Sequence, residues 1–171
     1  MTRRSRNLWL LLSALALAGV PALADDDLAW GFEARLGGFQ EAPPVSTMGR
    51  GEFQARLVKT ANGPALAFQL RYGDLEGGAV GAAHVHFGQR GVNGGVSAFL
   101  CGGGGKPACP DSGTTTGVIA PEDVLGPTGQ GIRAGELREL LRAMRGGVAY
   151  VNVHTETFRD GEIRGQIEAR D

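Results

Sequence analysis

The strongest constraint on the fold is a series of short segments in which apolar and polar residues alternate, each bounded by glycine, proline or asparagine. Alternation with a period of two is typical of β-strands that bury one face. The 29 glycines of this 171-residue chain supply many of the turns between segments. The segments are residues 30–36, 51–59, 65–72, 79–87, 95–100, 113–120, 147–154 and 161–168. The pattern predicts an all-β Greek-key sandwich or barrel.

One segment follows a different period. Residues 134–144 place four apolar side chains at helical spacing, and two glycines follow at 146 and 147. The four apolar residues are Leu137, Leu140, Leu141 and Met144. This spacing predicts one short amphipathic helix in a late loop, packed against the sheet.

The N-terminus has the order of an export signal. Basic residues up to Arg6 precede an apolar run over 8–18, and small residues precede Ala24. The apolar run is shorter than the roughly 20 residues that a membrane-spanning helix needs. We therefore expect residues 1–24 to be a cleaved signal peptide and residues 25–171 to form one periplasmic or secreted domain without a membrane span.

Charge and cysteine content narrow the function further. The leader carries three of the 17 basic residues and none of the 18 acidic ones, so residues 25–171 have a net charge of −4. An acidic domain lacks the basic footprint of a nucleic-acid-binding protein.

Cys101 and Cys109 lie close together in a glycine-rich segment, and an oxidising compartment predicts a disulfide between them. Two free thiols on a loop are the alternative.

The three histidines all fall in predicted strands, on the face opposite the apolar residues. Val85 separates His84 from His86, so the two imidazoles project from one face, roughly 6.5–7 Å apart at Cα. His154 ends segment 147–154 with Asn152 on the same face. In segment 161–168, Ile163, Gly165 and Ile167 form the core set, which leaves Glu162, Arg164, Gln166 and Glu168 pointing outward.

If these strands are neighbours, the histidines form a metal site. Neutral imidazole suits copper or zinc, whereas calcium and magnesium prefer oxygen. A closed structural zinc site needs a fourth protein ligand, so copper is favoured over zinc. We expect His84, His86 and His154 to bind one solvent-accessible copper ion.

The neighbours of this site have predicted roles too. Glu162 and Asn152 would lie beside the ligands, and Arg164 would guide an anion or pair with Glu162. Copper affinity should fall below roughly pH 6.5, because imidazole must be neutral to bind a metal. The alternative is that His84 and His86 are surface residues under a loop and that His154 ends its strand by chance.

Other chemistries lack support. The sequence has no Gly-x-Ser-x-Gly elbow, and the glycines at 102–105 lack the lysine and following helix of a phosphate-binding loop. Glu41 precedes Ala-Pro-Pro and is interpreted as part of a stiff turn and not as a ligand.

Several motifs together resemble the CHRD domain, first named from chordin. They are LGGFQEAPPV at 36–45, AAHVHFG at 82–88, YVNVHT at 150–155 and GEIRGQI at 161–167. The resemblance covers nearly all of residues 25–171. It implies an extracytoplasmic β domain that occurs in bacteria as a secreted protein and in chordin as part of an extracellular binding protein.

A more distant resemblance concerns the histidines. The His-Val-His strand at 84–86 is similar to the copper-ligand strand of Cu/Zn superoxide dismutases, and His154 is similar to a later copper ligand of that family. Arg164 lies near the position of that family's anion-guiding arginine. The chain has no fourth histidine and no zinc loop, so the resemblance implies a copper-only site.

Three functions are consistent with these features. The first is an exported protein that binds copper for handling or redox. The second is a superoxide dismutase-like copper enzyme, and the third is a metal-free extracellular interaction module. No protein partner is identifiable from the residues.

Overall fold

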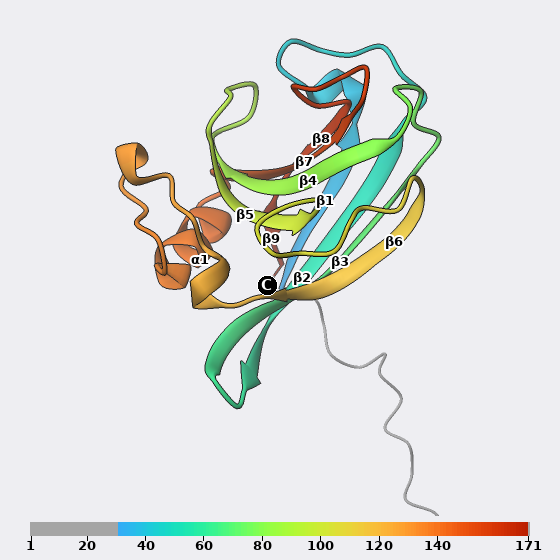
Figure 1. Ribbon diagram of the computed structural model, residues 1–171. Coiled ribbons are helices and arrows are strands. Elements are labelled where there is room, and N and C mark those ends of the chain that lie inside the picture. Colours follow the sequence, from blue (N-terminus) through green and yellow to red (C-terminus); the bar gives the residue numbers. More distant parts are fainter. Residues whose placement is uncertain (1–30, 171) are drawn as a thin grey trace, which may run out of the picture.

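The computed structural model describes residues 31–170, and within them nine strands form one antiparallel sheet (Figure 1). The predicted leader 1–24 and Trp30, which begins the first predicted strand, lie outside the described residues. The strands are β1 (Phe32–Gly37), β2 (Arg50–Thr60), β3 (Gly63–Gly73), β4 (Val80–Phe87), β5 (Gly95–Cys101), β6 (Gly113–Ile119), β7 (Ala149–Thr155), β8 (Ile163–Gln166) and β9 (Glu168–Ala169). All eight predicted strand segments contain strand.

The sheet is nearly closed and barrel-like. Its strand order is β5-β4-β7-β8-β1-β2-β3-β6, and β9 pairs with β1. The two ends of this path, β5 and β6, lie against each other. Some neighbouring strands are distant in sequence. Strands β4 and β7, for example, are about 70 residues apart along the chain but lie side by side in the sheet. The all-β prediction is confirmed.

The interior is filled by the apolar residues of the alternating pattern. In β2 and β3, Phe53 pairs with Leu70 and Ala55 pairs with Phe68, and all four are buried. The rings of Phe53 and Phe68 stack with centroids 6.4 Å apart. Burying each large side chain stabilises the fold by about 1.5–3 kcal/mol, so strict alternation determines which face turns inward.

The predicted helix exists but begins later than its periodicity indicates. Helix α1 spans Leu137–Arg145 instead of 134–144, and it lies at one end of the sheet (Figure 1). Gly135 adopts a left-handed φ of +86°, which a continuing right-handed helix does not allow. The predicted apolar stripe is correct, because Leu137, Leu140, Leu141 and Met144 are all buried.

Three further details differ from or extend the predictions. Short 3₁₀ turns that the sequence did not predict lie at η2 (Gly38–Gln40), η3 (Pro121–Asp123) and η4 (Thr128–Gln130). The last predicted strand is interrupted at Ile167, between β8 and β9. Cys101 and Cys109 form the predicted disulfide, with Cα atoms 5.0 Å apart. None of the helices between residues 31 and 170 has the length and apolar character needed to cross a bilayer.

The outward face of β4, β7 and β8 is largely covered, and this corrects the expectation of a solvent-accessible face. Arg164 is 1% exposed although it lies on the outward face with Asn152 and Tyr150, and Glu162 is fully buried. The loop after β1 and the loop before β8 lie together at the upper end of the view in Figure 1, and Thr47 donates a hydrogen bond to Glu162 between them. A third loop, residues 88–94, is tied down by Arg164. Loops therefore cover the face on which the histidines lie.

Candidate metal centre

The three histidines come together because β4 and β7 pair in antiparallel register. His84 lies opposite Asn152, Ala82 opposite His154, and His86 opposite Tyr150. Alternate residues of both strands share one face, so the side chains at 84, 86, 152 and 154 meet there. One ligand nitrogen from each histidine lies within 4.8 Å of the others.

The distances within this cluster fit a single small ion. His84 Nδ1 lies 3.1 Å from His154 Nε2, and the ring centroids of His84 and His86 are 5.3 Å apart. Ligand nitrogens around a tetrahedral ion with bonds of 2.0–2.1 Å lie roughly 3.4 Å apart. Small side-chain shifts would therefore give all three imidazoles bonding distances to one metal.

Backbone carbonyls fix the orientation of two of the rings. His86 Nδ1 lies 3.0 Å from the Gly94 carbonyl oxygen, and His154 Nδ1 lies 2.8 Å from that of Arg159. In a neutral ring Nδ1 must carry the proton to make these bonds, which leaves a lone pair on Nε2. Metal-binding histidines usually donate their second nitrogen in this way. The Nε2 atoms of His84 and His86 are buried and have no hydrogen-bond partner.

Burial keeps the imidazoles neutral. Burial, together with the neighbouring His154 and His86, lowers the pKa of His84 to about 3. Burial also lowers the pKa of His86 to about 4 and shifts that of His154 downward. Neutral imidazole is the form that binds a metal. The rings are therefore ready to act as ligands well below pH 6.5, and proton competition should begin at a lower pH than the sequence suggested.

These shifts predict that the metal-free domain loses stability in mild acid. Histidine in the unfolded chain titrates near 6.5, whereas His84 and His86 in the fold have pKa values of about 3 and about 4. Protonation therefore favours the unfolded chain. The stability is complete above pH 6.5 and falls toward pH 4, by at most about 1.4 kcal/mol per pH unit for each histidine. Urea unfolding midpoints at pH 7.0, 5.5 and 4.5 measure this loss.

Glu41 acts in the opposite direction. Its burial raises the pKa from 4.5 to about 7, so its ionisation costs stability as the pH rises through that interval. Because several histidines oppose one carboxyl group, the net change on acidification to pH 4.5 is a loss. Midpoints that do not change with pH would contradict buried neutral histidines. The Glu41→Gln variant should show a steeper loss.

A stack of three side chains supports His86. Its ring lies parallel to that of Tyr150, with centroids 4.7 Å apart and planes inclined by 5°. On Tyr150 lies Arg164, with Cζ 3.3 Å from the ring centroid. The Arg164 guanidinium donates hydrogen bonds to the carbonyls of Gln89 and Val92 and to the side chain of Asn93. Arg164 is therefore buried and engaged with the 88–94 loop, and it does not face solvent.

Glu162 belongs to a separate network. Its carboxylate accepts hydrogen bonds from the hydroxyls of Thr47 and Thr155 and from the amides of Glu76 and Gly77. None of these partners is a histidine. Glu162 therefore joins three loops and does not contact the histidines. Asn152 was also predicted to lie beside the histidines, and its Oδ1 atom is 2.9 Å from His154 Nε2.

Sequence reasoning missed Glu41. Its side chain is 5% exposed, and its Oε1 has no hydrogen-bond partner. The fold places Glu41 beside Asn152, and both side chains lie against the backbone of Gly161. A Cβ atom added to Gly161 would lie only 2.3 Å from Glu41 Oε1. A glycine next to Glu162 gives no indication of this contact in the sequence, because the two segments are about 120 residues apart.

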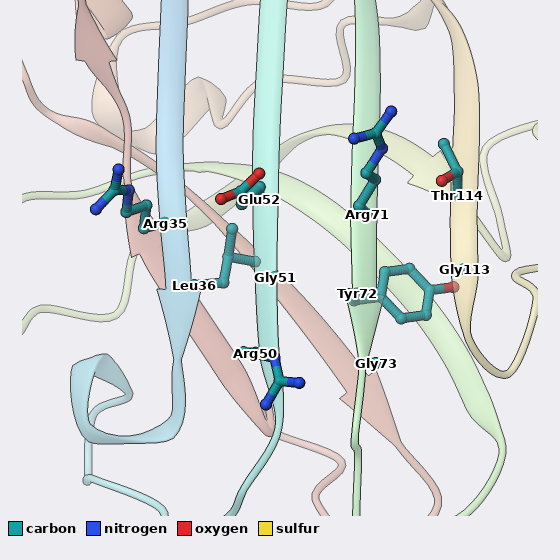
Figure 2. Close-up of a pocket in the computed structure, with 10 residues that line it drawn as sticks. All are labelled: Arg35, Leu36, Arg50, Gly51, Glu52, Arg71, Tyr72, Gly73, Gly113 and Thr114. Carbon is teal, nitrogen blue, oxygen red and sulfur yellow. The ribbon is translucent and has the colours of Figure 1, made fainter.

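A separate hollow of about 560 Å³ lies on the sheet formed by β1, β2, β3 and β6. Figure 2 shows polar side chains from four neighbouring strands there, Arg35, Glu52, Arg71 and Thr114. These four are cross-strand partners in one row. The residues that line the hollow include no histidine or cysteine, so it is not a site for a borderline metal.

Fold and site together define a nearly closed antiparallel β domain with a buried imidazole cluster on the outer face of its sheet. The chain belongs to the CHRD domain family, whose model matches residues 32–167. CHRD domains occur in extracellular proteins. Comparison with curated proteins and with solved structures finds no match.

Proposed function

We propose that this protein is an exported copper-binding protein in which His84, His86 and His154 hold one ion. The observation that carries the proposal is the convergence of three neutral imidazoles, among which the buried Nε2 atom of His86 has no hydrogen-bond partner. A buried acceptor without a donor costs about 1–3 kcal/mol, and a metal ion would remove that cost. The proposal includes the leader 1–24 and an extracytoplasmic domain from 25 to 171. The disulfide and the family support export.

Copper is the ion we favour. The cluster offers three nitrogen ligands and no thiolate, a set that suits copper or zinc. Copper(II) binds nitrogen sites more tightly than zinc does. Zinc remains the competing ion in the test below.

Copper storage or transfer fits the site better than rapid turnover of an anion. The ligand atoms of His84 and His86 are buried, and the Arg164 guanidinium is engaged with loop carbonyls. An anion-guiding arginine has to face the solvent from which the anion arrives. The superoxide dismutase-like alternative would require rapid superoxide consumption that is lost in Arg164→Ala.

The test is a titration of the metal-free protein with copper(I), copper(II) and zinc at pH 7.5. We expect His84→Ala, His86→Ala and His154→Ala each to weaken copper binding at least about tenfold, which is about 1.4 kcal/mol. Gln69→Ala, on the outward face of β3 and outside the cluster, is the control and should bind like the native protein. Native protein that binds copper no more tightly than the triple His→Ala variant would leave the metal-free interaction module as the better reading.

A further inference from the structure

Asn152 lies at the centre of the histidine cluster. It is 3% exposed, and β7 places it opposite His84 on one side and Arg164 on the other. Its Oδ1 atom is 2.9 Å from His154 Nε2. The carboxamide oxygen is therefore within reach of the same point as the ligand nitrogens.

The hydrogen atoms of the cluster do not account for this contact. His154 uses its Nδ1 proton on the Arg159 carbonyl, so its Nε2 carries a lone pair. Asn152 Oδ1 carries lone pairs as well, and two acceptors 2.9 Å apart have no proton between them. His86 Nε2 likewise carries a lone pair, because the Nδ1 proton of His86 goes to the Gly94 carbonyl. Such an arrangement is repulsive without a cation and favourable around one.

A reversed amide would not relieve the repulsion. The Nδ2 atom of Asn152 faces the Asp160 carbonyl oxygen at 3.5 Å. Asn152 Nδ2 also faces the Glu41 carboxylate across Gly161. A Cβ atom added to Gly161 would lie 2.8 Å from Asn152 Nδ2 and 2.3 Å from Glu41 Oε1. Reversal would place the amide oxygen against both of these oxygens. The acceptors behind the amide therefore turn Oδ1 toward the imidazoles.

Glu41 is held in this place at a cost. It is buried, its Oε1 has no partner, and no ion pair involves it within residues 31–170. Gly161 has a φ of +126°, and any side chain there would strike the carboxylate. Groups that orient a metal ligand from behind are commonly retained in this way.

We infer that the carboxamide oxygen of Asn152 is a fourth ligand to the ion, and that Glu41 is the positioning residue that directs it. This inference rests on the proposed copper site and extends it from three nitrogens to three nitrogens and one oxygen. An oxygen ligand favours copper(II), whereas copper(I) prefers softer donors. Asn152 therefore selects the oxidised ion.

The experiment measures copper(II) and copper(I) affinity and the copper(II) EPR spectrum at pH 8, where Glu41 is ionised. In Asn152→Leu we expect copper(II) to bind about tenfold more weakly or worse, with copper(I) changed by less than about threefold. Asn152→Asp restores an oxygen and should restore copper(II) binding, with an altered EPR spectrum. Glu41→Gln should also weaken copper(II) binding, and Gln54→Leu, on the outward face of β2 and outside the cluster, is the control.

Two outcomes would overturn the inference. One is Asn152→Leu that is folded by circular dichroism and binds copper(II) as the native protein does. The other, decisive even if the leucine variant does not fold, is an Asn152→Asp spectrum identical to that of the native protein. Failure of the copper site itself looks different, because native protein would then bind no more tightly than the triple His→Ala variant.

Discussion

Replacing Arg164 with methionine should lower the free energy of unfolding by about 2–4 kcal/mol and loosen the metal site. The guanidinium donates three hydrogen bonds to residues of the 88–94 loop and lies on the Tyr150 ring. Methionine removes all of these contacts. It also removes the cost of burying a charge that has no ion-pair partner within residues 31–170, and this offsets part of the loss.

The effect on the metal site follows from the loop that Arg164 holds. Gly94, at the end of this loop, donates its amide to the Tyr150 hydroxyl and accepts the Nδ1 proton of His86. A free loop no longer fixes the His86 ring, and loss of such a contact typically costs 10–100-fold in metal affinity. Urea unfolding and copper titration measure the two effects separately.

Arg164→Lys is the matched control. It keeps the charge but lacks the planar fork that reaches several acceptors at once, so both effects should be intermediate. An Arg164→Met protein with native stability and native copper affinity would show that the stack of His86, Tyr150 and Arg164 plays no part in the site.

Replacing Glu162 with alanine should cost about 3–5 kcal/mol. The substitution leaves the hydroxyls of Thr47 and Thr155 and the amides of Glu76 and Gly77 without their acceptor. Each buried donor left unpaired costs about 1–3 kcal/mol, although water entering the site would recover part of this. The measurement is urea unfolding of metal-free protein at pH 7.

The pH dependence of a second variant identifies the carboxylate as the cause. Burial opposes ionisation of Glu162, but hydrogen bonds from Thr47, Glu76, Thr155 and Gly77 outweigh it and hold the pKa below 4.5. The stabilisation is therefore present above pH 4.5 and is lost as the pH falls through the lower pKa of the folded protein. The stability difference between native protein and Glu162→Gln should shrink below pH 4.5. A constant difference would contradict this reading.

Much of the fold could be predicted from the sequence because its signals are local. Alternation at Ala83 and Val85, or at Val151 and Val153, determines which face of each strand is buried, and all four are fully buried. The same alternation placed the three histidines on one common face. The disulfide followed from the short separation of Cys101 and Cys109.

Other features needed the structure because they depend on loops and long-range register. Arg164 and Glu162 were expected to point outward into solvent, but Arg164 is buried against the 88–94 loop, and Glu162 is buried in hydrogen bonds with residues of other loops. Glu41 was interpreted as part of a stiff turn, yet the fold places it behind Asn152. The alternation of apolar and polar residues along a strand does not indicate which loop will cover which face of the sheet.

By itself the sequence determined the strands, the helix, the inward face of each strand and the identity of the histidines, because side-chain direction along a strand depends only on the local period. Only the tertiary structure decided that β4 pairs with β7, that the imidazoles meet beneath loops, and that Asn152 and Glu41 lie behind them. Strand pairing and loop packing depend on contacts between segments that are distant in sequence, so they are determined by the free energy of the whole domain.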